Sequence, residues 1–315
     1  MGTSHAPILP ADDAGIGKAA RLLRGGGLVA IPTETVYGLA ARADSDAAVA
    51  AIYRAKGRPN FNPLIVHVAS LKQAKSLAKF SDDAQRLAEC FWPGPLTLVL
   101  PTREAAPLAG AVTAGLPSVA LRCPAHPVMR AVLRECGVPL AAPSANRSGA
   151  VSPTSAAHVA ASLGEKVDLI LDGGACETGI ESTIVALREN GDWQVLRPGP
   201  IPESQISAVL GGPNEGVTST ARVEAPGQLA SHYAPGKPVR LSAEQAEPDE
   251  FHIGFGDISG DVNLSREADL AEAASRLYAA LHQAAAADQP RIAVAPVPEE
   301  GMGAAINDRL RRAAA

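Results

Sequence analysis

The stretch AAVAAIYRAKGRPNFNPLIVHV, residues 47–68, contains the kinds of segment from which the fold is built. Ala47–Ala55 has the apolar spacing of a helix and follows a cap-like Asp-Ser-Asp at 44–46. Leu64–Val68 is an apolar run of strand length. Between them, Lys56–Leu64 places two cations around a glycine and adds two prolines, which stiffen the chain. A helix, a basic loop and an apolar strand in this order indicate an α/β fold.

The alternation continues outward from this stretch to about residue 207. The predicted strands are Leu28–Pro32, Leu64–Val68, Leu96–Leu100, Ser118–Arg122, Leu140–Ala142, Leu169–Asp172, Thr183–Leu187 and Trp193–Arg197. Further predicted helices are Asp82–Cys90, Val128–Glu135 and Ser155–Leu163. We therefore expect residues 1–207 to form one α/β domain.

A segment rich in Gly, Pro, Ser and Thr breaks the pattern at residues 211–236 and indicates a linker. After it, the predicted strands are Val239–Leu241, Phe251–Phe255 and Arg291–Ala295, and the predicted helices are Asp269–Ala286 and Met302–Arg312. We expect a linker over residues 208–237 and a small C-terminal α/β domain over residues 238–315.

Composition excludes several function classes. Of the 315 residues 46% are hydrophobic, so the chain can bury a core, and 3% are aromatic, which disfavours a surface for stacking bases. Residues 1–207 hold 19 Lys/Arg and 18 Asp/Glu, a balance of +1, whereas residues 208–315 hold 9 and 15, a balance of −6. An anionic ligand is therefore expected in the first domain, and the net charge of −5 argues against a dedicated nucleic-acid binder.

The cysteines and the N-terminal residues bear on the compartment. The four cysteines, Cys90, Cys123, Cys136 and Cys176, form no CxxC pair, so a zinc site has no support and a reducing compartment fits. Met1–Asp13 lacks an apolar run preceded by basic residues, and no stretch approaches a membrane span. We expect a cytoplasmic protein without membrane association.

The loop Lys56–Leu64 has two interpretations. Lys56 and Arg58 could face a polyphosphate, with the arginine making planar bidentate contacts and the lysine acting as a point charge. A solvated basic loop is the more frequent meaning of a bare K-x-R. A P-loop is not expected, because the chain has no G-x-x-x-x-G-K-[ST] sequence.

Polar residues follow several predicted strands, where α/β folds bind ligands. Thr35 could hydrogen-bond a small polar substrate, and Glu34 could act as a base or orienter, although a capping role is the simpler expectation. Ser144 and Asn146 suit either a nucleotide or an ordinary turn. Ser152 is compatible with the N-cap of the following helix.

Two arginines and two histidines also stand out. Arg122 and Arg197 end strands and would need an anionic partner if buried; otherwise they form surface salt bridges. His67 lies inside an apolar strand, where a satisfied core histidine is the usual case. His232 and Tyr233 lie in the linker, as a packing anchor or a contact that closes over a site.

Each of these patterns is weak alone, but their order along the chain is specific. PTETVYGL (32–39), KGRPNFNPL (56–64), WPGPLTLVL (92–100), APSAN (142–146), GIESTIV (179–185), RPGPI (197–201) and HYAP (232–235) resemble the YrdC-type threonylcarbamoyl-AMP synthases. The match covers most of residues 15–207. GMGAAINDRLRRA (301–313) further resembles the end of the extra domain of the long form.

The resemblance implies a fold and a reaction. The fold would be a twisted, open mixed α/β sheet of the YrdC type with a small Rossmann-like C-terminal domain. L-threonine, bicarbonate and ATP would give L-threonylcarbamoyladenylate and pyrophosphate. A partner threonylcarbamoyl transferase would use the product to modify adenosine in tRNA, and tRNA itself is a further candidate partner.

The resemblance also assigns roles to residues, and Mg²⁺ would accompany ATP as cofactor. Lys56 and Arg58 would be catalytic. L-threonine would be held by Thr35, His67, Arg122, Ala142 and Ser182. ATP would be surrounded by Lys56, Arg58, Asn62, Ser118, Ser144, Asn146, Ser152, Arg197 and Tyr233. No protein ligand is assigned to the metal.

Two departures and two alternatives remain. PGQLAS (226–231) lacks the cations and aromatics that the long form usually carries before HYAP, and the C-terminal domain is short for the family. A non-catalytic RNA-binding module of the same fold is one alternative, against which the charge and aromatic content count. The carbamoyl-transfer module of hydrogenase maturation is the other, but its zinc-type cysteine pairs are absent.

Overall fold

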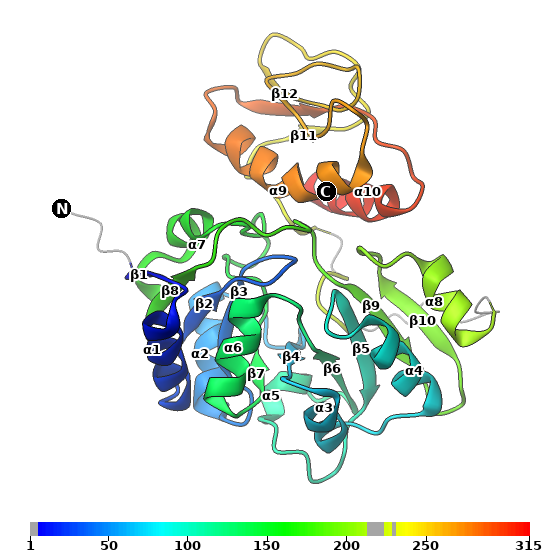
Figure 1. Ribbon diagram of the computed structural model, residues 1–315. Helices are drawn as coiled ribbons and strands as arrows, with labels where there is room; N and C mark the ends of the chain where they lie inside the picture. Colours follow the sequence, from blue (N-terminus) through cyan, green and yellow to red (C-terminus); the bar gives the residue numbers. More distant parts are fainter. Residues whose placement is uncertain (1–5, 213–223, 229–230) are drawn as a thin grey trace.

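The structure is a computed structural model that describes residues 6–212, 224–228 and 231–315. It has a larger domain that begins with strand β1 (Ile8–Pro10) and a smaller C-terminal domain beside it (Figure 1). Much of the predicted linker, residues 213–223 and 229–230, lies outside the described residues.

A ten-stranded mixed sheet forms the larger domain, in the order β1-β8-β2-β3-β7-β4-β6-β5-β9-β10. Its strands are β1 (Ile8–Pro10), β2 (Val29–Ile31), β3 (Gly38–Arg42), β4 (Ile65–His67), β5 (Leu96–Pro101), β6 (Ser118–Arg122), β7 (Leu140–Ala141), β8 (Leu169–Asp172), β9 (Thr183–Leu187) and β10 (Trp193–Arg197). Its helices are α1 (Asp13–Arg24), α2 (Asp46–Lys56), α3 (Leu71–Leu77), α4 (Asp82–Phe91), α5 (Gly110–Thr113), α6 (Pro127–Cys136), α7 (Ala156–Leu163) and α8 (Glu203–Leu210), with a 3₁₀ turn at Gly164–Lys166.

Local chemistry explains why helix α2 leads into the basic loop. The Ser45 side chain caps its N-terminus by accepting from the Ala48 N–H. Gly57 ends it in the left-handed conformation, at φ 60°, where a glycine carries no Cβ penalty. Strand β4 follows, buried throughout, and pairs with β6 and β7.

One face of the sheet is covered unevenly, and this produces the site. Helices α1 and α6 pack over β2, β7 and β8 in a single apolar cluster. The neighbouring strip on β4, β5, β6 and β9 forms a separate cluster, to which the linker contributes Ala225. Because strand side chains alternate between faces, Ser118, Ala120 and Arg122 share one face of β6. On this strip the linker residue Ala225, rather than a helix, packs in the cluster.

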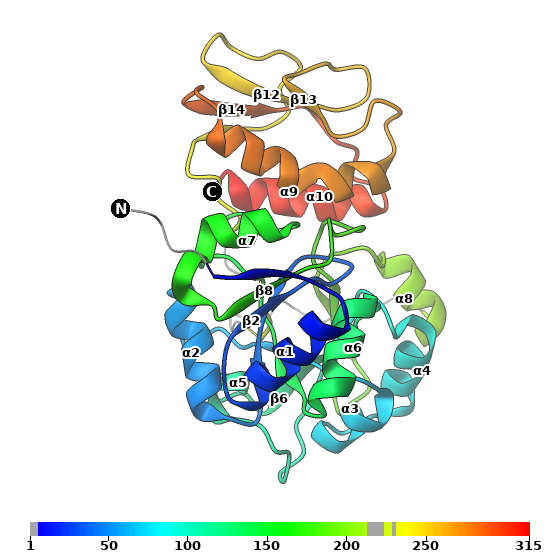
Figure 2. The ribbon, with the colours of Figure 1, turned by 60° about the vertical axis from the view of Figure 1, so that its left-hand side comes forward.

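The smaller domain has a four-stranded parallel sheet in the order β11-β14-β12-β13. Its elements are β11 (Val239–Arg240), β12 (Glu250–Gly254), β13 (Val262–Asn263), β14 (Arg291–Val294), α9 (Leu270–Ala286) and α10 (Met302–Ala313). Figure 2 shows α9 and α10 between this sheet and the larger domain. The two helices therefore form the docking face of the smaller domain.

The α/β prediction is confirmed for both domains, and each strand and helix predicted from the sequence is present with ends shifted by one residue at most. The sequence reading missed β1, β3, β13, α1, α3, α5 and α8. Helix α8 runs to Leu210, so the first domain continues past the expected boundary at residue 207.

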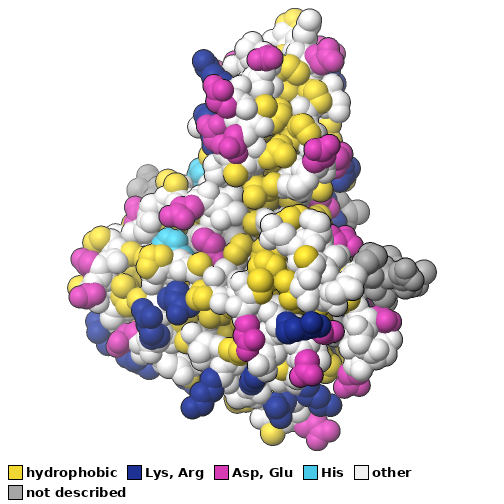
Figure 3. All heavy atoms as spheres, turned by 45° about the vertical axis from the view of Figure 1, so that its right-hand side comes forward, with side chains coloured by type: hydrophobic (Ala, Val, Ile, Leu, Met, Phe, Trp, Pro, Cys, Tyr) yellow, Lys and Arg dark blue, Asp and Glu magenta, His cyan; other side chains and the backbone are white. Residues whose placement is uncertain are grey.

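The charge asymmetry is visible on the surface. Most Lys and Arg side chains in the view of Figure 3 lie on the larger domain. Within the described residues, no helix combines the length and apolarity needed to cross a bilayer.

Candidate active site

A cavity lies where strands β4, β6 and β10, the loop before β9 and the linker meet. Its volume is about 50 Å³, which is room for only a few water molecules. Nine of the fourteen residues predicted for the site line it: Thr35, Arg58, His67, Arg122, Ala142, Ser144, Ser182, Arg197 and Tyr233. The fold therefore gathers residues that are up to 198 positions apart in sequence.

We call Glu34, Thr35, His67 and Arg122 the Arg122 side of the cavity. The Arg122 guanidinium donates to Glu34 Oε1 at 2.7 Å and to Thr35 Oγ1 at 2.9 Å. Burial alone would raise the pKa of Glu34, but the charge and hydrogen bonds of Arg122 outweigh it and lower that pKa. The expected capping role of Glu34 is wrong, because its carboxylate orients Arg122 instead.

His67 differs from a satisfied core histidine. Its side chain is buried and lines the cavity, yet its Nδ1 has no hydrogen-bond partner. Burial, followed by the charge of Arg122, lowers the pKa of His67 to about 3, so the ring is neutral at physiological pH. A buried polar atom without a partner is costly, and a polar ligand group would remove that cost.

Arg58, Arg197, Pro226 and Tyr233 form the Arg197 side of the cavity. Arg58 donates to the carbonyls of Asn62 and Pro63, at 3.2 and 2.9 Å. Arg197 donates to the Ser182 carbonyl at 2.9 Å and to the Pro226 carbonyl at 3.3 Å. Among the described residues no carboxylate forms an ion pair with either arginine.

Burial is unfavourable for these two charges. It lowers the pKa of Arg58 to about 10, and it also lowers the pKa of Arg197. Backbone carbonyls satisfy their donors but supply no net negative charge. An anion entering the cavity would therefore be stabilised by both guanidiniums.

Lys56 is not among the residues that line the cavity. Its ammonium is buried and donates to the carbonyls of Ser144 and Asn146, each at 2.6 Å. Burial and then the charge of Arg58 lower the pKa of Lys56 well below its ordinary value. In this structure Lys56 holds the turn that presents Ser144, while Arg58 faces the cavity.

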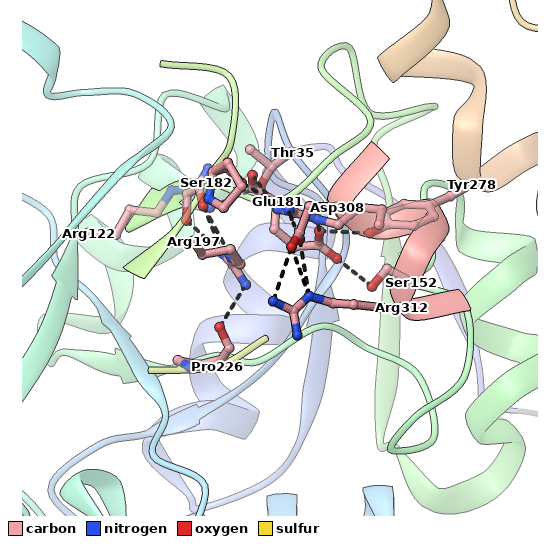
Figure 4. Close-up of polar contacts among 12 residues, drawn as sticks. Thr35, Arg122, Ser152, Glu181, Ser182, Arg197, Pro226, Tyr278, Asp308 and Arg312 are labelled. Carbon is pink, nitrogen blue, oxygen red and sulfur yellow. Dashed lines mark hydrogen bonds and ion pairs between the residues drawn. The ribbon is translucent and has the colours of Figure 1, made fainter. Parts of the chain in front are cut away.

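The loop before β9 joins the cavity to its surroundings (Figure 4). The Ser182 hydroxyl bonds Thr97 at 2.8 Å, and it also accepts from Arg197 at 3.2 Å. Glu181 is buried beside it and accepts from the Ser152 hydroxyl at 2.6 Å. Ser152 is therefore a partner of Glu181, whereas Ser155 is the N-cap of α7, so the capping role expected for Ser152 is wrong.

The described part of the linker closes the cavity. Tyr233 is 1% exposed, and Ala234 bonds the Gly149 carbonyl at 2.8 Å. Gly227 has φ +87°, and a Cβ there would lie 2.8 Å from Arg197 Cδ. Glycine is therefore the residue that fits where the linker passes Arg197. The linker thus contacts the site through Pro226 and Gly227 as well as through the HYAP segment.

The remaining predicted residues lie outside the cavity. The side chains of Asn62 and Asn146 are buried, and Asn62 Oδ1 has no hydrogen-bond partner. Ser118 lines a separate depression with Val99 and Glu224. Ala142 lines the cavity, but its N–H is already donated to the Ile65 carbonyl at 3.0 Å.

The side chains around the cavity do not form a site for Mg²⁺. The carboxylates nearest the cavity, Glu34 and Glu181, are both paired with arginines. The described part of the chain contains no cluster of three His, Cys, Asp or Glu that could hold a metal. The residues present therefore do not fit a protein-held Mg²⁺, and we derive no step from it.

Sequence reasoning missed several functional side chains. Thr33 and Pro226 line the cavity, and Tyr278 and Arg309 bond Glu181 from the other domain. Thr33 lies in the PTETVYGL motif and could have been included. Nothing local in the sequence indicates that Arg309 reaches a residue 128 positions earlier.

Comparison with known proteins agrees with this geometry. A Sua5/YciO/YrdC family model described as telomere recombination matches residues 21–199, and one described as the threonylcarbamoyl-AMP synthase C-terminal domain matches residues 201–315. Threonylcarbamoyl-AMP synthase of Bacillus subtilis is 40% identical over 97% of this chain and 94% of its own. The Pyrococcus abyssi enzyme of the same name is 41% identical over 94% and 92%.

A solved structure covers both domains. The crystal structure of P. abyssi Sua5 complexed with L-threonine has a TM-score of 0.88 at 37% identity, over 98% of this chain and 97% of that one. The relatives carry the name of an enzyme, which favours catalysis over the RNA-binding alternative. The chain belongs to the threonylcarbamoyl-AMP synthase family, in its form with a C-terminal domain.

Proposed function

We propose that the protein condenses L-threonine, bicarbonate and ATP into L-threonylcarbamoyladenylate, with release of pyrophosphate. One observation carries this proposal: two buried arginines, Arg58 and Arg197, face the cavity with carbonyls as their hydrogen-bond partners. Such a pair is suited to a triphosphate. The Arg122 side, with a neutral histidine and a threonine hydroxyl, is suited to a small polar zwitterion.

Threonine is assigned to the Arg122 side. Its carboxylate would pair with the Arg122 guanidinium, which Glu34 and Thr35 already hold in place. His67 Nδ1 would gain the hydrogen-bond partner that it lacks. The crystallised P. abyssi relative was complexed with L-threonine, which supports this choice of substrate.

ATP is assigned to the Arg197 side and to the apolar strip beyond it. Glu224 lines the second depression together with Ser118 and Val99, whereas Pro226 and Gly227 line the cavity. The segment 224–228 therefore lies between the two hollows. If it moves aside, the triphosphate can meet Arg58 and Arg197 while the nucleoside lies along the strip toward Ser118.

The volume supports this movement, because about 50 Å³ holds a few waters and not a nucleotide. Pro226, Gly227, His232 and Tyr233 are the lining residues that the linker contributes. We infer that ATP displaces this wall and that its return excludes water from the reaction.

The chemistry requires positioning more than a strong base. The threonine nitrogen takes up carbon dioxide, or bicarbonate with loss of water, and forms a carbamate. A carbamate oxygen then attacks the α-phosphorus, and the bond to the pyrophosphate oxygen breaks. Both reactants are anionic, so Arg58 and Arg197 would act by bringing them together and offsetting their charge. Mg²⁺ would arrive on the triphosphate, held by phosphate and water.

The product is expected to pass to a threonylcarbamoyl transferase that modifies tRNA in the cytoplasm. A mixed anhydride with AMP is easily hydrolysed, so a nearby acceptor would limit its loss. Direct contact with the transferase or with tRNA remains a separate proposal.

The test is threonine-dependent turnover by the purified full-length chain. With ATP, bicarbonate and L-threonine, we expect pyrophosphate release and a product with the mass of threonylcarbamoyladenylate. Omission of either threonine or bicarbonate should abolish both. Pyrophosphate release that is indifferent to threonine would overturn the proposal.

A further inference from the structure

Glu181 is a buried carboxylate whose partners come from both domains (Figure 4). Its Oε1 accepts from the Ser152 hydroxyl of the larger domain at 2.6 Å. Its Oε2 accepts from the Tyr278 hydroxyl at 2.8 Å and from Arg309 Nε at 3.0 Å. Tyr278 lies on α9 and Arg309 on α10, so the smaller domain provides the cation that neutralises this carboxylate.

Arg309 is fully buried and holds more than one segment. It donates to the Pro198 carbonyl at 2.8 Å, directly after Arg197, and to Asp308 at 2.8 Å. Its guanidinium carbon lies 5.6 Å from the ring centre of Tyr233. One arginine of the second domain thus contacts the two loops that carry Ser182 and Arg197, and also the linker tyrosine.

Glu181 and Arg197 line the same cavity. Glu181 immediately precedes Ser182, whose carbonyl and hydroxyl accept from Arg197. Burial would raise the pKa of Glu181, but the charges of Arg309 and then Arg197, with bonds from Ser152 and Tyr278, lower it to about 2. The two arginines therefore act on the same buried anion, and only Arg309 is bonded to it.

We infer that Arg309 and Tyr278 are positioning residues of the reaction, which bind the Glu181 carboxylate so that the Arg197 guanidinium stays available to the triphosphate. The inference rests on the proposed function, because that function assigns Arg197 to ATP. It gives the smaller domain a place in catalysis, since an isolated larger domain would carry Glu181 without its cation.

A purely structural role makes a different prediction. If Arg309 only joins the domains, its loss weakens docking whatever residue stands at 181. If Arg309 neutralises Glu181, its loss leaves the buried Glu181 carboxylate unpaired. Removing that negative charge should then restore ATP binding. Rescue by a second substitution therefore separates the two roles.

The experiment compares four full-length chains: wild type, Arg309→Met, Arg309→Met with Glu181→Gln, and the control Arg311→Met. Arg311 is on the same helix but 57% exposed, where its side chain pairs with Glu299 on the surface. For Arg309→Met we expect the KM for ATP to rise at least tenfold while the KM for threonine changes less than threefold. In the double variant the KM for ATP should return to within about threefold of wild type, and Arg311→Met should match wild type throughout.

Tyr278→Phe covers the case in which Arg309→Met does not fold. It removes one hydroxyl, so we expect a two- to fivefold rise in the KM for ATP that disappears when Glu181→Gln is added. A wild-type KM for ATP in both Arg309→Met and Tyr278→Phe would overturn the inference, as would a defect that Glu181→Gln fails to relieve. Failure of the proposed function looks different, because the wild type itself would then show no threonine-dependent pyrophosphate release.

Discussion

The two sides of the cavity bury arginines in opposite ways. On the Arg122 side the guanidinium is paired with Glu34, a carboxylate from the loop after β2 of the same domain. On the Arg197 side Arg58 and Arg197 bond carbonyls, and the nearest carboxylate, Glu181, is bonded to Arg309 of the other domain. The first side is complete within one domain, whereas the second depends on the linker and the smaller domain.

The difference matches what each side would bind. A paired arginine remains ordered without ligand and can orient a single carboxylate. Two buried arginines without a carboxylate partner cost free energy, and a bound polyanion would offset part of that cost. We therefore propose that the Arg122 side is preformed and that nucleotide binding completes the Arg197 side.

The largest effect is expected on the Arg122 side. Arg122→Met should lower kcat/KM for threonine by about 100- to 1,000-fold, because a charge-assisted bidentate contact is worth roughly 3–4 kcal/mol. Steady-state kinetics with varied threonine measure it, with Arg130→Met on α6 as control. Since Glu34 would be left unpaired, Arg122→Met with Glu34→Gln should be made in parallel. An unchanged kcat/KM for threonine in both would mean that the substrate carboxylate lies elsewhere.

Substitutions of Lys56 and Arg58 should have different effects, the first mainly on stability and the second mainly on ATP binding. Lys56→Met leaves the carbonyls of Ser144 and Asn146 without a donor, and we expect a loss of about 2–3 kcal/mol in the free energy of unfolding. Arg58→Met should instead raise the KM for ATP more than tenfold with a smaller loss of stability. Chemical denaturation and kinetics on both variants measure this contrast, and identical profiles would remove the distinction between the residues.

Acid should destabilise both sides through buried histidines. Burial lowers the pKa of His67 and of His232 to about 3, whereas the unfolded chain binds their protons near pH 6.5. The unfolded state then holds more protons below pH 6.5, so stability falls as the pH drops from 6.5 toward 3. At pH 5 each histidine should cost about 2 kcal/mol.

Urea unfolding at pH 7 and pH 5 measures this loss. The pKa of Glu181 is lowered to about 2 and that of Glu34 is also lowered, so these carboxylates stay ionised throughout this window. Replacing His232 by Gln should remove about 2 kcal/mol of the difference between the two pH values. Equal stability of the wild type at pH 7 and pH 5 would contradict the neutral, buried state of these rings.

The smallest effect is expected at the far end of the nucleotide. Ser118→Ala should raise the KM for ATP about two- to fivefold, since a neutral hydrogen bond contributes roughly 0.5–1 kcal/mol, and leave the KM for threonine unchanged. The same kinetics measure it, and Thr102→Ala in the same depression is the matched control. A change in the KM for threonine would place Ser118 in a different role.

Much of the fold could be predicted from periodicity alone, because most strands and the longer helices between residues 28 and 312 have clear apolar spacing. The short strand β3 was missed, because its sequence GLAAR is rich in glycine and alanine and contains no β-branched residue. Site residues that lie in recognisable motifs, such as Thr35 and Arg197, were predicted to belong to one site, and both line the cavity. The pairing of Glu181 with Arg309 could not be predicted, since it depends on how two separately folded domains dock.

The loop before β9 touches the main chain of helix α9 at Gly179. Gly179 has φ +74°, and a Cβ there would collide with the backbone of Ser275 on α9. The clash involves main chain, so no change of side chain on α9 can relieve it. A residue other than glycine at 179 would require the whole of helix α9 to shift. Substitutions at this interface would therefore have to occur together rather than one position at a time.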